Sequence, residues 1–472
     1  MDHKVLLGVA ATRRFIFSKE DAQKYKNLTL EKLKSMNVDF IDMEDVNDEG
    51  MLRPNEDISG VVEKFKRAKV DAVFFPHANF GTEDIVCKVA KELGVPVLLW
   101  GPRDEAPLED GSRLRDTQCG LFATGKVFRR MNIPFTYIPN CRLEDTVFER
   151  GVRNFIAAVN VVKEFKRCKI LQISTRPADF WTMMCNEGEL LERYNIQLLP
   201  VPLPDIIDEV LRLEKTEDTD VLETVAAIHE KMDVKVSEQS VKRLASLKCA
   251  MKNFALSNGC NAIAIQCWNA LQRQLQIHPC VANALLTDEG IPVACETDIH
   301  GAITAVMVQA AGMGKTPSFF ADWSVRHPEN PNGELLQHCG PWPLSLAVDK
   351  PVLSGPFAFD DHFPGAVFAE IRGGEMTLAR FDADHGEYSL LLGPARGIPG
   401  PSTAGTYVWI EVDNWVELED KLVTGPYVHH CVGIHGDVTP VLYEACKYIG
   451  LKPDFFYDGQ ETTVKRWLRG EI

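Results

Sequence analysis

The sequence has no CxxC pair among its thirteen cysteines, no long apolar run and no cluster of basic residues. The cysteines are spread along the chain, most of them in apolar surroundings. This favours free buried thiols over disulfides or a zinc site. No stretch approaches the roughly 18 apolar residues of a membrane span, and the N-terminal run MDHKVLLGVAA leads straight into charged residues, as a first strand would. We expect a cytoplasmic protein with no membrane partner.

Basic residues are fewer than acidic residues. The chain has 51 Lys and Arg against 67 Asp and Glu, a net charge of −16, which argues against a nucleic-acid partner. Hydrophobic content of 45% and charged content of 25% are ordinary for a globular protein. At 472 residues the chain is too long for one hydrophobic core, so we expect two to four domains.

Short apolar runs alternate with amphipathic, helix-like stretches over most of the chain. This alternation is typical of doubly wound, Rossmann-like α/β domains with parallel strands. It predicts a first α/β domain over 1–168 and a second over 169–348. From 349 to 472 the pattern changes to alternating β segments separated by glycine, proline and aspartate turns. This predicts a C-terminal antiparallel, barrel-like β domain, closed by a single helix over 439–449.

Three apolar runs between 291 and 343 (IPVACETD, PSFFADW and ELLQHCGPWP) are each followed by an acid or an imidazole. We expect these runs to be strands of the second α/β domain, with Glu296, Asp322 and His338 at their carboxyl ends, where open α/β sheets bind ligands. The pair His429-His430 follows in the C-terminal domain. Carboxylates with imidazoles form a ligand set for a divalent cation of the manganese type.

Taken singly, each of these residues has an ordinary structural explanation. Glu296 or Asp298 can cap the next helix, with aspartate the better cap, and Asp322 can end a turn. A lone His338 is more often a partly buried histidine than a ligand. Their repetition at one sheet edge favours a shared cation, because carboxylates brought close together need a cation or protons between them.

Two further features bear on ligands. Trp268 is among several tryptophans near these edges, where aromatic rings can pack on sugars, although core packing explains any single one. GMGKT at 312–316 lacks the first glycine of a phosphate-binding loop, because Gln309 stands there, and it ends a helix instead of opening one.

The segments IQCW, PVACETD, FAD, HCG and HHCVGIHGD, in a chain of two α/β domains and a β domain, resemble the L-fucose isomerase and L-arabinose isomerase superfamily. The resemblance covers nearly the whole chain and indicates a divergent, shorter branch. It implies aldose–ketose isomerisation of an open-chain sugar through an ene-diol. It also implies a bound Mn²⁺, or another divalent cation such as Co²⁺ or Mg²⁺.

The resemblance assigns roles to particular residues. It implies Glu296, Asp322 and His430 as metal ligands, and His338 matches a further ligand of the arabinose branch. Glu296 and Asp322 would also be the acid/base pair. Trp268, His429 and Arg13 are expected to contact the sugar. By analogy Arg13 or Arg14 would reach it from a neighbouring subunit, since family members form homo-oligomers with sites near subunit interfaces, although both arginines could equally be surface charges.

Several alternatives stay open at this point. The scaffold could belong to a sugar-binding or regulatory protein, or to a metal-dependent epimerase or aldolase that uses the same enediolate. The sequence does not identify the sugar or say whether it carries a phosphate or sulfonate, and it does not give the oligomer size. It also leaves open whether His338 binds the metal or the substrate, and which residue of the pair His429-His430 is the ligand.

Overall fold

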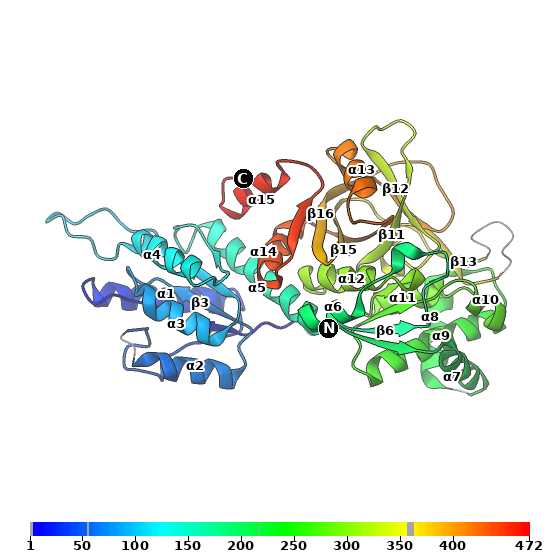
Figure 1. Cartoon of the computed structure of the whole chain (residues 1–472), viewed down its shortest axis with the longest axis horizontal. Helices are drawn as coiled ribbons and strands as arrows, with labels where there is room; N and C mark the ends of the chain where they lie inside the picture. The colour runs from blue at the N-terminus through cyan, green and yellow to red at the C-terminus, as the bar shows by residue number, and fades with distance from the viewer. Residues whose placement is uncertain (1–2, 54–55, 217, 356–362) are drawn as a thin grey trace. The chain divides into compact units, whose positions relative to one another are not determined.

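A computed structural model describes residues 3–53, 56–216, 218–355 and 363–472 (Figure 1). These residues form two compact units. The smaller unit contains the chain up to Lys163, with 443–450 and 461–472, and the larger unit contains 164–442 and 451–460. The division into three domains at 168/169 and 348/349 stays a prediction.

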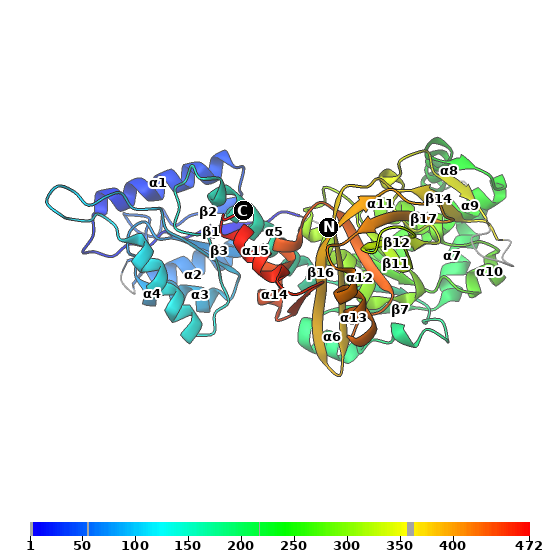
Figure 2. The same ribbon diagram turned by 90° about the horizontal axis from the view of Figure 1, so that it is seen from above.

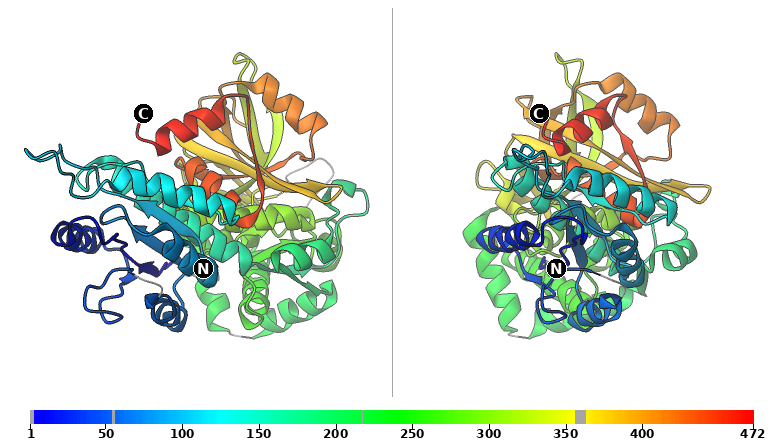
Figure 3. Two further views of the ribbon diagram at one scale, coloured as in Figure 1. Left: turned by 60° about the vertical axis from the view of Figure 1, so that its left-hand side comes forward. Right: turned by 90° about the vertical axis from the view of Figure 1, so that its left-hand side faces the viewer.

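The smaller unit is a five-stranded parallel sheet with helices on both faces (Figure 3). In sheet order its strands are β2 (Phe40–Ile41), β1 (Leu7–Val9), β3 (Ala72–Pro76), β4 (Val97–Trp100) and β5 (Thr136–Tyr137). One face packs on α1 (Lys19–Ser35) and α5 (Thr146–Lys166). The other face packs on α2 (Asp57–Ala68), α3 (Glu83–Leu93) and α4 (Thr117–Arg130).

The larger unit begins with a second parallel sheet, of four strands. In sheet order these are β10 (Val293–Ala294), β9 (Ala262–Ile265), β6 (Lys169–Ile173) and β7 (Gln197–Val201). The helices of this unit that precede residue 312 are η1 (Trp181–Met183), α6 (Glu187–Tyr194), α7 (Leu203–Lys215), α8 (Thr219–Lys231), α9 (Glu238–Ser257), α10 (Ala270–Leu275), α11 (Cys280–Asp288), η2 (Cys295–Thr297) and α12 (Ile299–Ala311).

Six antiparallel strands of the larger unit close into a barrel, because β16 pairs with both β15 and β17 (Figure 2). Around the barrel they are β11 (Phe319–Arg326), β12 (Gly333–His338), β17 (Thr406–Glu411), β16 (Glu387–Ile398), β15 (Glu375–Asp384) and β18 (His430–His435). At its margins the sheet continues into β14 (Ala366–Glu370), β13 (Val352–Ser354), β8 (Asp233–Val234) and β19 (Lys452–Phe455). The α/β class with a barrel-like β domain is therefore confirmed.

The helix α12 joins the parallel sheet to the barrel. Every residue of α12 is buried, and it contacts β9 and β10 on one side and β15 and β18 on the other (Figure 1). A helix covered on all sides is apolar around its whole circumference, as the run AITAVMVQAA is. Because Glu296 immediately precedes this helix, one candidate residue is held at the junction of sheet and barrel.

The structure corrects three of the sequence predictions. The strands β11 and β12 belong to the barrel and pair antiparallel with β18, β17 and each other, so Asp322 and His338 do not lie at carboxyl ends of the parallel sheet. A helix, α13 (Trp415–Thr424), interrupts the predicted all-β segment; Asn414 caps it and Trp415 packs into the barrel core. The helix α14 (Thr439–Ile449) has the predicted bounds, but α15 (Gln460–Leu468) follows it; the short η3 (Leu344–Leu346) lies before the barrel's later strands.

None of the helices in the described residues combines the length and apolarity that crossing a membrane requires.

Candidate metal and sugar site

Glu296 lies in the turn between β10 and α12. Its backbone adopts a left-handed conformation, with φ 54° and ψ 20°, and its side chain is buried. This conformation is uncommon for a residue with a Cβ and persists where the surrounding structure holds it, often at functional sites. The turn directs the glutamate toward the barrel strands.

One carboxylate oxygen of Glu296 is bound and the other is not. Oε1 accepts hydrogen bonds from Cys267 Sγ and from Trp268 Nε1, each at 3.1 Å. Oε2 has no hydrogen-bond partner among the described residues, although it is buried. It lies 3.6 Å from His338 Nε2 and 3.7 Å from His430 Nε2. A buried carboxylate oxygen without a donor is costly unless a ligand satisfies it.

Asp322 shows the same pattern from the barrel side. It pairs across the ladder with His430, because β11 and β18 are neighbours in antiparallel register. Its Oδ1 is buried without a hydrogen-bond partner in the described part of the chain, 3.4 Å from His430 Nε2 and 3.9 Å from His338 Nε2. Three strands and one turn thus bring two carboxylates and two imidazoles to one point.

These separations are too long for good hydrogen bonds. They suit donor atoms arranged around a small cation, and two carboxylate oxygens with the Nε2 of His430 fit a divalent ion of the manganese type. Glu296, His338 and His430 each offer a ligand atom within 4.8 Å of the others, as do Asp322, His429 and His430. The residues present therefore fit the metal that the sequence predicts.

The two carboxylates have different electrostatic surroundings. Burial raises the pKa of Asp322 above its usual value, against the opposing effect of His338 and His430. For Glu296 burial acts in the same direction, but the neighbouring imidazoles of His338 and His430 outweigh it, so its pKa lies below the usual value.

The other ring nitrogen of His430 is held by a buried acid. Nδ1 lies 2.9 Å from Asp298 Oδ2, and both residues are buried. A carboxylate at this distance accepts the Nδ1 proton, which leaves the Nε2 lone pair facing Glu296 and Asp322. His430 is thus the buried member of the pair His429-His430, and its Nε2 lies 3.7 Å from Glu296 Oε2 and 3.4 Å from Asp322 Oδ1.

Asp298 has a second set of contacts. It caps α12, accepting from the backbone N–H of Gly301 at 2.8 Å, as aspartate at this position predicts. It also pairs with Arg380, whose Nη2 is 3.1 Å from Oδ1. Although burial favours the neutral acid, Arg380 and His430 hold the pKa of Asp298 far below its usual range.

The network continues away from the site. Arg380 donates from Nε to Asp382 at 2.8 Å, and Asp382 Oδ1 lies 2.8 Å from His300 Nδ1. Arg380, Asp382 and His300 were not predicted from the sequence as part of the site. Arg380 and Asp382 stand on one face of β15 in its buried middle part, and such a charged pair was a signal in the sequence that could have found them.

His338 is held differently from His430. The backbone N–H of Cys339 donates to His338 Nδ1 at 3.0 Å. A neutral ring that accepts at Nδ1 carries its proton on Nε2. The Nε2–H then points at the carboxylates as a donor, a geometry that suits a contact to a carboxylate or a sugar oxygen.

The predicted substrate contacts lie in different places. Trp268 binds Glu296 and is 44% exposed, so its ring borders the site. His429 is exposed beside His430, with ring centroids 4.1 Å apart, and lines a pocket of about 460 Å³ with Trp323 and Trp415.

Arg13 belongs to the smaller unit. There it makes a bidentate ion pair with Glu49, including a 2.9 Å hydrogen bond. The hydrogen bond from Arg13 outweighs burial and lowers the pKa of Glu49 to about 2. The role of Arg13 in sugar binding stays a prediction.

Comparison with known proteins gives a consistent result. Residues 8–166 match the family described as fucose/sulfoquinovose isomerase, N-terminal domain. A sulfoquinovose isomerase of Priestia aryabhattai is 25% identical over 456 residues, covering 96% of this chain and 99% of the relative. One of Alkalicoccus urumqiensis is 24% identical over 81% of this chain and 85% of its own length. A D-allose-bound periplasmic solute binding protein from Actinobacillus succinogenes shares 12% identity over 66% of this chain and 92% of its own, with a TM-score of 0.16.

Proposed function

We propose that the chain is an aldose–ketose isomerase of the fucose-isomerase-like superfamily, and that it isomerises an open-chain sugar with the help of a divalent metal ion. The observation that carries the proposal is the pair of buried carboxylate oxygens, Glu296 Oε2 and Asp322 Oδ1, that have no hydrogen-bond partner among the described residues. Both face the Nε2 atoms of His338 and His430. A cation between them satisfies both carboxylate oxygens and the Nε2 lone pair of His430.

The residues that would hold the ion are Glu296, Asp322 and His430, with His338 beside them. A bound Mn²⁺, or Co²⁺ or Mg²⁺ in its place, would supply positive charge against the negative charge that develops on the sugar oxygens during isomerisation. Asp298 keeps the Nδ1 proton of His430, so that Nε2 is available as a ligand. Membership of a homo-oligomer and a cytoplasmic location stay predictions.

Isomerisation moves two protons, one from C2 to C1 and one from O2 to O1. Going from aldose to ketose, the C2–H proton is removed and the O1 carbonyl gains a proton, which gives the ene-diol. The O2 hydroxyl then loses its proton as C1 gains one. Glu296 and Asp322 are the two groups placed to accept and return these protons. His338, with its proton on Nε2, is placed to donate a hydrogen bond to a sugar oxygen.

The relatives' substrate adds a specific hypothesis. Sulfoquinovose is a sugar that carries a sulfonate, so an enzyme for it needs a cation near the far end of the sugar. Arg176 is half-buried and has no carboxylate within 4 Å in the described part of the chain. Among the residues that the structure describes, its Nη1 donates to the carbonyls of Pro177 and Ala178 alone, both at 3.1 Å.

The segment around Arg176 borders the site. The Thr175 carbonyl accepts from Thr297 Oγ1 at 3.2 Å, directly beside Glu296, and the Phe180 ring lies 6.4 Å from the His429 ring. An arginine with free donors in this position can bind a sulfonate through several N–H groups. We propose a sulfonated aldose as the substrate class, with Arg176 as its anchor.

The test is proton NMR of neutral and sulfonated aldoses and ketoses in heavy water, first with the chelated protein and then with Mn²⁺ restored. We expect Mn²⁺-dependent interconversion with deuterium entering at C1 or C2. Inversion at C2 without ketose would indicate an epimerase, and smaller fragments an aldolase. Sugar binding without exchange would overturn the proposal in favour of a binding protein on the same scaffold.

A further inference from the structure

Four cysteines from four different elements meet directly behind the candidate site. Cys267 follows β9, Cys280 begins α11, Cys295 follows β10 and Cys339 follows β12. All thirteen cysteines of the chain are free thiols. Independent packing of thiols in apolar cores does not require four of them to converge beside two candidate metal ligands.

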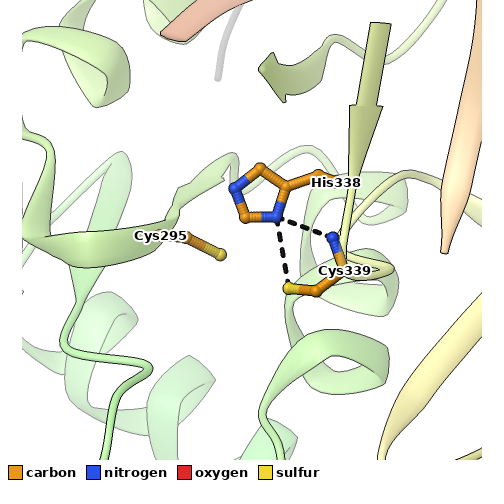
Figure 4. A group of neighbouring side chains, drawn as sticks. All are labelled: Cys295, His338 and Cys339. Carbon is orange, nitrogen blue, oxygen red and sulfur yellow. Dashed lines mark hydrogen bonds between the residues drawn. The ribbon is translucent and has the colours of Figure 1, made fainter. Parts of the chain in front are cut away.

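The contacts within this group, the thiol cluster (Cys267, Cys280, Cys295 and Cys339), are close. Cys280 Sγ lies 3.3 Å from Cys339 Sγ. Cys295 and Cys339 each offer a sulfur within 4.8 Å of the other and of a ring nitrogen of His338 (Figure 4). Cys339 Sγ lies 3.2 Å from His338 Nδ1, the nitrogen that faces away from the carboxylates.

We propose that Cys280, Cys295 and Cys339 form a second cation site, specific for a thiophilic ion of the Zn²⁺ or Cd²⁺ type, with His338 Nδ1 as its fourth donor. Thiolates with an imidazole select such ions over manganese, which prefers oxygen. Two sulfurs bound at about 2.3 Å to a tetrahedral zinc lie roughly 3.8 Å apart. Cys280 Sγ and Cys339 Sγ, at 3.3 Å, are closer than this, and Cys295 Sγ lies within 4.8 Å of Cys339 Sγ, so the three side chains must adjust when the ion binds.

A cation can reach the proposed thiol site and replace the protons of its thiols. Cys339 is half-buried, whereas Cys280 and Cys295 are buried, so an ion would enter past Cys339. Binding of the ion releases the thiol protons. The cation would replace the thiols' weak mutual hydrogen bonds with metal–sulfur bonds.

The thiol site shares His338 with the proposed manganese site. An ion on Nδ1 takes the lone pair that now accepts the Cys339 backbone N–H, and the ring must then turn. Its Nε2 would leave its position 3.6 Å from Glu296 Oε2. A thiophilic ion would therefore inhibit the enzyme by disturbing the neighbouring hard-metal site; this coupling, unlike the binding itself, depends on the proposed function.

Cadmium is the probe that separates these statements. The full chain is reduced, chelated and titrated with Cd²⁺, and the thiolate-to-cadmium charge-transfer absorbance is recorded. We expect a tight equivalent of Cd²⁺ in the wild type that is lost in both Cys280→Ala and Cys339→Ser. Cys119→Ser, which removes an exposed thiol of the smaller unit, should retain it. Melting curves of the chelated proteins show whether each variant folds.

A wild-type titration that is unchanged in Cys280→Ala would overturn the thiol site, whatever the activity of the protein. The coupling between the thiol site and the proposed manganese site is measured separately, as the Mn²⁺ affinity determined by electron paramagnetic resonance. Prior Cd²⁺ loading should weaken Mn²⁺ binding at least about tenfold in the wild type and not in Cys280→Ala. Tight Cd²⁺ binding with unchanged Mn²⁺ affinity would refute the coupling and leave the thiol site standing.

Discussion

His430 Nδ1 and Asp298 Oδ2 lie 2.9 Å apart in the buried junction between α12 and the barrel. The same aspartate caps α12 and pairs with Arg380. One side chain thus ties the helix that follows Glu296 to the strand that presents His430. The position of His430 therefore depends on α12, the helix that follows Glu296.

Replacing Asp298 by asparagine should weaken metal binding, although none of the proposed metal ligands is itself replaced. An amide can no longer hold the Nδ1 proton of His430 as strongly, and Arg380 loses one charged partner. Loss of such a supporting carboxylate typically costs about 10- to 100-fold in metal affinity. Mn²⁺ affinity of Asp298→Asn, measured by calorimetry, checks this.

Asp218 provides the matched control. It caps α8 in the same unit through hydrogen bonds from the backbone N–H groups of Asp220 and Val221. Asp218→Asn therefore makes the same chemical change at a helix cap away from the candidate ligands. Equal losses of Mn²⁺ affinity in both variants would show that capping, and not the contact to His430, explains the effect.

Glu296→Gln and Asp322→Asn should each abolish turnover while leaving the metal-free protein folded. Each carboxylate has one buried oxygen without a hydrogen-bond partner among the described residues. Removing the negative charge from either residue should therefore not lower the stability of the chelated protein. Mn²⁺ at 100 times its Kd should stabilise the wild type by about 2.7 kcal/mol, and the variants much less. Melting curves with and without Mn²⁺ measure both effects. Retained turnover in the two variants would contradict the proposed roles.

The alternation of strands and helices predicted the fold class because the hydrophobic period differs between the two elements. It could not assign β11 and β12 to the barrel, since PSFFAD and ELLQH are short apolar runs that fit a parallel or an antiparallel strand equally well. Pairing partners such as Asp322 and His430 lie more than a hundred residues apart, and a local pattern does not reveal them.

The candidate site was predictable as a set of residue types but not as a network. Glu296, Asp322, His338 and His430 stand out after apolar runs. His430 carries its proton on Nδ1 because of Asp298, and His338 carries its proton on Nε2 because of the Cys339 backbone N–H. Neither contact has a sequence signal. The thiol cluster was missed because its cysteines form no spaced motif, and each alone reads as a buried thiol.

Arg176→Gln should reduce specificity for sulfonated sugars. Loss of charge-assisted hydrogen bonds to the sulfonate costs roughly 1.5–3 kcal/mol, which corresponds to about 10- to 150-fold in kcat/KM. Neutral sugars should be affected little, because the metal and the carboxylates are intact. The ratio of kcat/KM for a sulfonated and a neutral aldose measures the change.

Arg212→Gln is the control for the loss of a positive charge in the larger unit. Arg212 is exposed and already paired with Glu209 at 2.7 Å. Its removal should leave the ratio unchanged. A parallel fall for both sugars in Arg176→Gln would assign Arg176 to the folding of the loop and not to the sulfonate.

Glu334, on β12, predicts a pH-dependent loss of stability. It is 3% exposed, and its Oε2 has no hydrogen-bond partner among the described residues, with Arg326 Nε at 3.5 Å. Burial, partly opposed by Arg326, raises the pKa of Glu334 to about 7 from 4.5. Between these pH values the folded protein holds a proton that the unfolded chain has lost. Its contribution to stability is therefore complete below pH 4.5 and lost as pH rises through about 7.

Glu334→Gln cannot ionise and should escape this loss. At pH 4 the variant and the wild type should have similar unfolding midpoints. At pH 8 the variant should be more stable by up to about 3 kcal/mol, the free energy that corresponds to the shift in pKa. Glu375→Gln, at an exposed position of β15, should show no such difference. Denaturant unfolding across this pH range measures the difference: an offset between Glu334→Gln and the wild type that stays constant from pH 4 to pH 8 would show that folding does not shift the pKa of Glu334.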